Sequence, residues 1–426
     1  MVGRPRQGLA TRLQLANNEG AGLSRRHKAD HWILILAALL LTIGLVVVYS
    51  ISPGLAASQN ISQSYFVTKQ IIDVLLGVVA FTAASFVPIS TWRQLIKPIA
   101  ILALVGALIV MVTPINATYP AHRWIRLGSY SFQIAELIKL ALLLWKASFL
   151  TKQYRAGKLA DFSETLKPLL IVMAVVGIAV AKLESDLGSA GVMVAMMGLM
   201  AFVVGIPLKK VSLIALVILA LLVVAISSSA YRRERLATFL HPETNCQGSG
   251  YQACEAFISV GSGGVFGLGL GNSVQAYGYL PEASNDSIFA ILAEKFGFIG
   301  TVSILVIYGA FVSRVKRVIE RTKDQFSRLL TVGVLAWFST QALINICAMV
   351  GLLPLKGITL PLISQGGTSL VFLAAALGII FQISRYTSYS NVEPEILANE
   401  ASTNNSLNGR RVRGSHNPYT VSRPRT

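Results

Sequence analysis

The sequence predicts an all-α polytopic membrane protein with about ten transmembrane helices, both termini in the cytoplasm and one long outer loop between helices 7 and 8. Three observations lead to this prediction. Hydrophobic residues make up 54% of the chain, only 13% of residues are charged, and the mean hydropathy is +0.62. Apolar runs of membrane-spanning length recur along the chain. Lysine and arginine are concentrated in alternate connections between these runs.

The apolar runs give the order of the elements. A transmembrane helix needs about 20 residues, with a lower limit near 17, so the shorter runs must include flanking residues. The predicted spans are 32–49, 71–87, 98–112, 134–150, 168–183, 187–206, 211–229, 288–312, 329–353 and 370–383. Only a short polar stretch separates the fifth span from the sixth, so we expect these two helices to be closely connected.

The net charge of +18 is explained by topology. With the amino terminus inside, the predicted cytoplasmic segments hold 27 of the 37 lysines and arginines, Lys146 among them, and the outer segments hold eight. Lys139 and Lys295 lie within predicted helices. This asymmetry follows the positive-inside rule and favours anionic lipid, so no nucleic-acid partner is needed to explain it. Residues 1–31 contain no apolar stretch, so we expect no cleavable signal peptide.

The chain divides into two tails and one membrane domain. Residues 1–31 and 387–426 are polar, which predicts disordered cytoplasmic tails around a transmembrane domain at 32–386. The outer connection, 230–287, is far longer than a link between helices requires, and such loops are usually functional or disordered. Its glycine-rich stretch GSGGVFGLGLGNS lacks the Gly-Lys-Ser/Thr ending of a phosphate loop. We interpret it as flexible backbone at the membrane surface.

The three cysteines indicate no zinc site. Cys246 and Cys254 lie eight positions apart in the outer loop, where an oxidising compartment permits a disulfide. Sequence alone leaves the bridge and two free thiols equally open, because bridging depends on geometry. Cys347 falls within a predicted helix and is interpreted as a packing residue.

Ionisable residues at membrane depth are costly and therefore informative. Glu136 and Lys139 lie three positions apart on one face of a predicted helix, so they can pair. A structural ion pair is preferred over direct catalysis. Asp186 either caps the sixth helix or lines an outward cavity. Asp286 lies on the outer face at the start of the eighth helix, where capping is its default role.

Four sequence blocks resemble the SEDS family, which is named for shape, elongation, division and sporulation and contains bacterial lipid II polymerases. The blocks are GSGYQACEAFISVGSGGVFGLGLGNSVQAYGYLPEASNDSIFAILAEKFGFIG, HRWIRLGSYSFQIAELIKLAL, ESDLGSA and LLPLKGITLPLISQGGTSL. Together with the ten spans, the resemblance covers nearly the whole chain except the tails. The pattern GNSVQ followed by YLPEA is more similar to the division branch of the family than to its elongation branch.

The resemblance implies a peptidoglycan glycosyltransferase that polymerises lipid II on the outer face of the bacterial cytoplasmic membrane, at the division septum. The GlcNAc C4 hydroxyl of one lipid II would attack MurNAc C1 of the growing strand and release undecaprenyl pyrophosphate. The implied partners are lipid II, a class B penicillin-binding protein transpeptidase and other division proteins. A lipid II flippase, an elongation-type polymerase and a non-catalytic scaffold remain alternatives. Broken helices in paired repeats would favour the flippase, and the sequence shows no such pairing.

The resemblance also implies the site residues. The family's essential carboxylate falls on Asp286, as the general base for the acceptor hydroxyl, a role that typically contributes about 10²–10⁴-fold. Cations stabilise the leaving diphosphate; Arg123 is the first candidate and Lys356 the next. A divalent ion, Mg or Mn, near Asp286 would share this role. The remaining supporting positions are Gln275, Glu282, Asp186, Ser364 and the structural ion pair Glu136 and Lys139.

The chain departs from the family pattern beside these residues. Ser284-Asn285 replaces the usual His-Thr before Asp286, and Ser287 replaces the following Phe. The other departures are Ile134-Ala135 for Pro-Ser, Ser185 for Pro, Gln365 for Tyr and Glu255-Ala256 for Gln-Ser. The acids and bases are kept and their neighbours are changed, which indicates a divergent member with an altered site environment.

Overall fold

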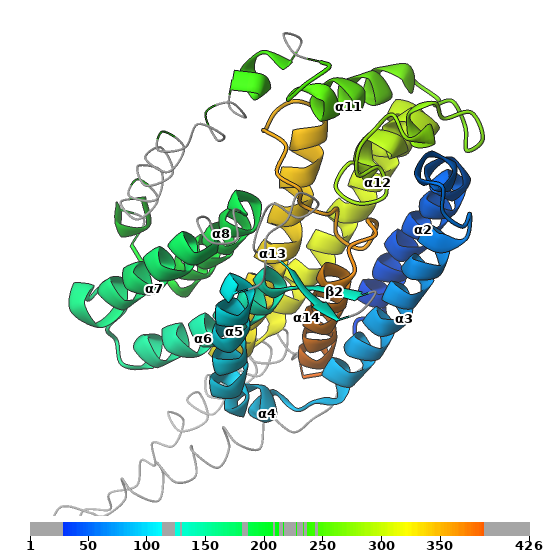
Figure 1. Cartoon of the computed structure of the whole chain (residues 1–426). Helices are drawn as coiled ribbons and strands as arrows, with labels where there is room; N and C mark the ends of the chain where they lie inside the picture. Colours follow the sequence, from blue (N-terminus) through cyan, green and yellow to red (C-terminus); the bar gives the residue numbers. More distant parts are fainter. Residues whose placement is uncertain are drawn as a thin grey trace, which may run out of the picture. The chain divides into compact units, whose positions relative to one another are not determined.

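Helices dominate the structure, a computed structural model that describes residues 29–112, 124–127, 130–180, 186–207, 209–212, 237–242 and 246–386 and the single residues 216, 227 and 233 (Figure 1). The α-helices are α2 (His31–Gln59), α3 (Tyr65–Phe86), α4 (Ile89–Gln94), α5 (Ile96–Val112), α6 (Ile134–Arg155), α7 (Lys167–Ile178), α8 (Leu187–Val204), α11 (Tyr251–Ser262), α12 (Ile288–Arg321), α13 (Gln325–Met349) and α14 (Thr368–Ser384). A π-helix, η1 (Phe162–Leu166), a 3-10 turn, η4 (Gln275–Tyr277), and two strands complete the described elements.

The predicted spans can be compared with these helices. Nine of the ten coincide with helices of the described part, whereas 211–229 lies almost entirely outside it, so the count of ten stays a prediction. Within the described ranges, α2, α3, α8, α12 and α13 are long and apolar enough to cross a membrane, and α5 and α14 are apolar but shorter. The two predicted tails lie outside the described residues except for positions 29–31.

Large apolar side chains remain exposed along α3 and α5. They include Ile71, Leu75, Leu76, Val78 and Val79 on α3 and Ile101, Leu102, Leu104, Leu108 and Ile109 on α5. Soluble monomers rarely expose contiguous apolar surface on this scale. By contrast, most residues of α6 and α13 are buried among the other helices. The exposed stripes therefore face lipid, and the predicted class of polytopic membrane protein is confirmed.

The position of Lys146 corrects the sequence analysis, which counted this residue among the cytoplasmic charges. Lys146 lies inside α6 with 2% of its surface exposed, and its ammonium group donates a hydrogen bond to the carbonyl oxygen of Met197 in α8. The residue falls within the predicted span 134–150, and its long aliphatic stem lets the charge reach a carbonyl of the neighbouring helix.

A short hairpin that the sequence did not predict precedes α6. Strand β1 (Trp124–Leu127) pairs antiparallel with β2 (Tyr130–Gln133), with Trp124 opposite Gln133. The hairpin packs beside α14, where the Phe132 ring lies 5.6 Å from that of Phe372. Strand β2 runs directly into α6, so the hairpin fixes where that helix begins and places Gln133 at its first turn.

Helix α12 is broken at Gly297, which has φ 63° and ψ −163°. The break leaves backbone groups of α12 without hydrogen-bond partners in the helix, and residues 264–269 provide those partners. The amides of Leu268 and Gly269 donate to the carbonyls of Glu294 and Lys295 at 2.9 and 3.0 Å. In return, the amides of residues 298 and 299 donate to the carbonyls of residues 264 and 265. The structure corrects the interpretation of the glycine-rich stretch as flexible backbone, because the stretch is an ordered insert that satisfies the backbone of the broken helix.

Replacing Gly297 by alanine is expected to destabilise the fold by about 3 kcal/mol or more. A Cβ there would lie 2.4 Å from the Gly267 amide nitrogen and 2.6 Å from the Val265 carbonyl oxygen. Backbone strain of about 1–3 kcal/mol adds to overpacking of about 1–3 kcal/mol. Gly309 lies in the same helix with no heavy atom within 4 Å of its Cβ position. Gly309→Ala should therefore be neutral or slightly stabilising. Equal unfolding free energies for both variants in detergent would contradict the prediction.

Candidate functional site

Asp286 lies in the turn at residues 281–287, directly before α12. The segment between α13 and α14, residues 350–367, holds this turn in place through hydrogen bonds. Ser364 donates its hydroxyl proton to the carbonyl oxygen of Asn285 at 2.6 Å and accepts the amide of Leu360 at 2.7 Å. The amide of Gln365 donates to the carbonyl of Ser284 at 2.9 Å. The carbonyl groups of Ser284 and Asn285 are thus both held by hydrogen bonds from residues 364 and 365, which are distant in the sequence.

Helix α13 holds the next carbonyl of the same turn. The side-chain amide of Asn345 donates at 2.6 Å to the carbonyl of Asp286 and at 2.6 Å to the carbonyl of Ile358. Asn345 is 2% exposed, so these bonds form in a site from which water is excluded. The three backbone carbonyls from residue 284 to residue 286 are therefore all hydrogen-bonded, so the backbone that bears the Asp286 side chain is rigid.

The carboxyl group of Asp286 is buried and only partly satisfied. The residue is 9% exposed, and among the described residues its Oδ1 has no hydrogen-bond partner. Burial, followed by the negative charge of Glu282, raises the pKa of Asp286 to about 7. Asp286 does not cap α12, because the cap position is occupied by Ser287 and no side chain bonds there. A carboxyl with this pKa and a free oxygen has the properties of a general base near neutral pH.

Glu282 sits beside Asp286 in a left-handed backbone conformation, with φ 53°. Its carboxylate accepts the side-chain amide of Asn285 at 2.5 Å, and its carbonyl accepts the amides of Asn285 and Ser287. Glu282 also lines a cavity of about 300 Å³ that lies between the 278–285 turn and α2 and α3, with Gln59 and Phe66 on its other wall. Such conformations are costly for residues with a side chain and cluster at functional sites.

Lys356 and Gly357 lie between α8 and Asp286. A Cβ on Gly188, in the first turn of α8, would lie 3.2 Å from the Cβ of Lys356. A Cβ on Gly357, which has φ 61°, would lie 3.6 Å from Oδ2 of Asp286. Lys356 is half-buried and directly precedes the residue that packs against the Asp286 carboxyl. The structure therefore brings these two sequence-predicted residues into one region.

Asp186 joins α8 to the hairpin. Its Oδ1 accepts the amide of Ser189 at 2.9 Å, which caps α8, and its Oδ2 accepts the side-chain amide of Gln133 at 3.2 Å. Asp186 is 4% exposed and lies two residues before Gly188, which packs on Lys356. Its carboxylate thus has a capping role at the edge of the same region.

Glu136 and Lys139 form a buried ion pair on α6. Lys139 Nζ lies 2.7 Å from Glu136 Oε1, donates to Gln341 Oε1 at 3.3 Å, and lies 5.1 Å from the Trp337 ring centroid. The side-chain amide of Gln341 donates in turn to the carbonyl of Thr359 at 3.1 Å. Glu136 is 3% exposed and Lys139 is 1% exposed. The pair is therefore linked through α13 to the segment that carries Lys356.

Gln275 bonds to α12 beyond the turn that carries Asp286. It begins η4, where its amide donates at 3.2 Å to Glu294 Oε1; Glu294 also accepts the amide of Val274 and the hydroxyl of Ser273. Glu294 follows Asp286 by eight residues along α12, a rise of about 12 Å. The Gln275 side chain is buried, and within the described part its Oε1 has no partner.

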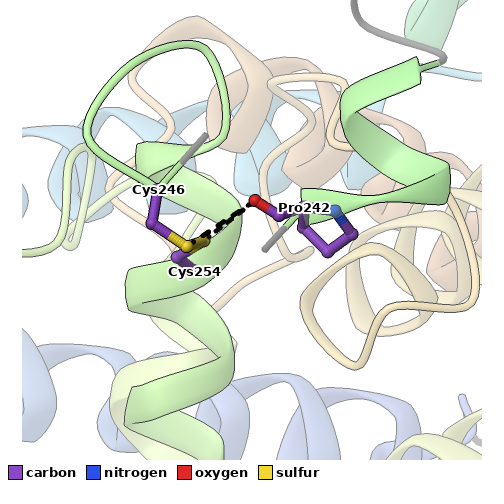
Figure 2. The surroundings of a disulfide bond; sticks show 3 residues. All are labelled: Pro242, Cys246 and Cys254. Carbon is purple, nitrogen blue, oxygen red and sulfur yellow. Dashed lines mark hydrogen bonds between the residues drawn. A yellow bond between two sulfur atoms is a disulfide. The ribbon is translucent and has the colours of Figure 1, made fainter. Parts of the chain in front are cut away.

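The remaining predictions concern Arg123 and the outer cysteines. Arg123 lies outside the described residues. Cys246 and Cys254 are joined by a disulfide with a Cα–Cα distance of 5.7 Å, and the carbonyl oxygen of Pro242 lies beside both sulfur atoms (Figure 2). Cys347 is a free thiol on α13.

Sequence reasoning missed four residues that hold the site: Gln252, Asn345, Gln341 and Glu294. A signal existed for two of them. Gln341 and Asn345 are amides four positions apart in an apolar span, so they share one helix face, and polar residues in such spans seldom lack a partner. Gln252 stands in a loop block that the sequence analysis used only for family resemblance, and nothing local marks it.

Three comparisons with known proteins agree with this architecture. Residues 30–389 match the family model for cell cycle proteins of the FtsW, RodA and SpoVE type. A probable peptidoglycan glycosyltransferase FtsW from Saccharophagus degradans is 35% identical over 86% of this chain and 95% of its own. Stage V sporulation protein E from Bacillus subtilis is 33% identical over 86% of this chain and 100% of its own.

Solved structures share the fold. A chain from a structure described as "Structural coordination of polymerization and crosslinking by a peptidoglycan synthase complex" matches with a TM-score of 0.67 and 26% identity, over 84% of this chain and 98% of its own. The rod shape determining protein RodA from Thermus thermophilus matches with a TM-score of 0.58 and 25% identity, over 84% and 98%.

Fold and site together define a polytopic membrane protein that holds a buried carboxyl group on a rigid turn at the end of a helix. The chain belongs to the FtsW/RodA/SpoVE family of cell cycle proteins, the SEDS family, as its sequence blocks predicted.

Proposed function

We propose that this chain is a peptidoglycan glycosyltransferase that polymerises lipid II and that Asp286 is its general base. The observation that carries the role of Asp286 is the buried carboxyl with an unpartnered oxygen on a rigid turn. The names of the relatives support the activity, because several relatives at 34–35% identity are named "Probable peptidoglycan glycosyltransferase FtsW".

The reaction forms one glycosidic bond and breaks one bond to phosphate. The C4 hydroxyl oxygen of the acceptor GlcNAc attacks C1 of the MurNAc at the end of the strand, and the bond from C1 to the undecaprenyl diphosphate breaks. The hydroxyl proton passes to the free oxygen of Asp286. Because the diphosphate is already a good leaving group, a second catalytic acid is not required, and one base suffices.

Positive charge must stabilise the diphosphate as it leaves. Lys356 is a candidate for this role, because it directly precedes Gly357, which packs against the Asp286 carboxyl. We propose Arg123 as a second cation, on the grounds of the family resemblance alone. Asp186 and Ser364 position their neighbours and are not proposed to touch substrate.

A divalent cation such as Mg²⁺ fits the residues present. Mg²⁺ is commonly held by one or two carboxylates together with substrate phosphates. Asp286 keeps its unpartnered oxygen for the hydroxyl proton, so the exposed Glu282 carboxylate, together with the diphosphate of the substrate, would hold the ion. Within the described residues, no group of three or more His, Cys, Asp or Glu side chains gathers as a metal site. When bound, the ion would neutralise charge on the diphosphate.

The polymerisation rate should fall as pH drops through about 7. Only the ionised Asp286 carboxylate can accept the hydroxyl proton, and its pKa is raised to about 7 by burial and then by Glu282. Below that pH the rate should decrease about tenfold per unit. Glu282→Gln removes the neighbouring negative charge, so it should move this acid limb to lower pH. Initial rates at saturating lipid II measure the pH profile. An acid limb whose midpoint lies near the ordinary pKa of aspartate would contradict the role of Asp286.

A flippase is the alternative that one observation favours, because α12 is a broken helix. Within the described residues no second helix carries a break of this kind, so the paired arrangement of transporters is not matched. The test is purified protein with its cognate class B penicillin-binding protein, given lipid II. Glycan polymer on gels supports the proposal; lipid II transport in vesicles without polymer would replace it.

The place of action is a further part of the proposal. We infer that the turn with Asp286 faces the outer side of the cytoplasmic membrane, from the charge asymmetry of the sequence. The structural relationship to a peptidoglycan synthase complex supports a transpeptidase partner. A fluorescent fusion that gathers at midcell would support a role at the septum, and a uniform lateral distribution would favour the elongation branch.

A further inference from the structure

The disulfide of the outer connection ties a turn to the start of a helix (Figure 2). Cys246 begins the turn at residues 246–250, and Cys254 lies in the first turn of α11, where it is 8% exposed. The carbonyl oxygen of Pro242 lies 3.3 Å from the Cys254 sulfur and 3.6 Å from the Cys246 sulfur. The bridge therefore fixes the turn to the helix, and residue 242 lies against it.

The first turn of α11 has no side-chain cap. Its cap position is Gly250, which has no side chain to bond the free amides of the helix start. A helix end without a side-chain cap frays more readily. Farther along, α11 is anchored on α12, where the Ser259 hydroxyl donates to the carbonyl of Ala290 at 3.0 Å. The disulfide thus adds a covalent link at the end of α11 that lies away from this anchor.

Gln252 lies in this turn, between the two cysteines, and it reaches the turn with Asp286. Its side-chain amide donates to the Ser287 hydroxyl at 3.1 Å. The same side chain favours the charged form of the Asp286 carboxyl and so opposes the rise in its pKa that burial causes. Ser287 is fully buried and stands where the family pattern has Phe, so its hydroxyl acceptor is a departure from that pattern.

We propose that Gln252 is a positioning residue for Asp286 and that the Cys246–Cys254 disulfide keeps Gln252 in place. This inference rests on the proposed function, since it assumes that Asp286 is the base. The disulfide restricts the conformations of the first turn of α11, so the Gln252 side chain stays bonded to Ser287, the residue next to Asp286. Loss of the bridge releases that turn while the Ser259 anchor keeps the rest of α11 on α12.

The first test compares Gln252→Ala with Gln247→Ala, an exposed glutamine inside the disulfide loop. Gln252→Ala should lower kcat about tenfold, as expected for the loss of a hydrogen bond to a charged group, and should move the acid limb of the pH profile upward. Gln247→Ala should change neither. The other titratable groups on the described elements against Asp286 are Glu282, Lys356, Tyr251, Glu255, Glu294, Lys295 and Cys347, and both variants leave them in place.

The second test reduces the bridge in folded protein. A dithiol reagent breaks the S–S bond and leaves two thiols, and the reagent itself is oxidised to a cyclic disulfide. Reduction of the wild-type chain should lower kcat and move the acid limb of the pH profile to higher pH, as Gln252→Ala does. Reoxidation should restore both the rate and the profile. In the Gln252→Ala background, reduction should have no further effect, because the bridge acts through Gln252. Cys347→Ser should respond to reduction like the wild type.

Two results would overturn the inference. One is a wild-type protein whose rate and pH profile are unchanged by complete reduction, verified by thiol labelling. The other is a loss on reduction of the same size with and without Gln252. Asp286→Asn in the same assay separates this inference from the proposed function: if that variant polymerises normally the function assignment fails, whereas an inactive Asp286→Asn beside an insensitive bridge removes the inference alone.

Discussion

Asp286→Asn should lower the rate of lipid II polymerisation by about 10²–10⁴-fold, the contribution of a general base. Asparagine has the shape of the protonated carboxyl but cannot accept the hydroxyl proton. Because burial already favours the uncharged form of Asp286, the substitution adds no cavity and no new charge, and the fold should be kept. Gel analysis of the glycan product measures the effect.

The control for this variant is Glu320→Gln, an exposed carboxylate near the other end of α12, away from the turn with Asp286. It should polymerise lipid II at close to the wild-type rate, and both variants should unfold at the wild-type temperature. A normal rate for Asp286→Asn would refute the site assignment. A lowered unfolding temperature for that variant would mean that the Asp286 carboxylate is a structural group.

Breaking the Glu136–Lys139 pair should have the largest effect on stability. Glu136→Gln leaves the Lys139 ammonium buried beside Gln341 without its anion, at 1% exposure. Removing one partner of a buried ion pair typically costs about 3–5 kcal/mol. The free energy of unfolding in mixed micelles measures the loss.

The double variant Glu136→Gln with Lys139→Met tests the pairing. Replacing both charges by groups of similar volume is often nearly neutral, so the double variant should recover most of the stability lost in either single variant. Additive losses would show that the two charges are stabilised independently. Full polymerase activity in a stable double variant would support the structural role, whereas its complete loss would indicate that the pair takes part in the chemistry.

Much of the fold could be predicted from the sequence, since hydropathy and charge act locally. Nine spans coincide with helices because an apolar run of sufficient length must satisfy its own backbone within a membrane. The break of α12 could not be predicted in this way. Gly297 is one of several glycines in that span, and the chain that satisfies its backbone comes from residues 264–269. The hairpin before α6 and the burial of Lys146 depend likewise on neighbouring helices.

The candidate site divides along the same line. The sequence by itself determined the class of membrane protein, the family and the choice of Asp286, because these rest on composition and on residues close together along the chain. Only the tertiary structure decided that the Asp286 carboxyl is buried, since the segments that cover and hold it are distant in sequence. Asn345, Ser364 and Gln252 reach its turn from α13, the 350–367 segment and α11. The pKa of Asp286 depends on this enclosure, because burial removes the water that would otherwise stabilise its charge.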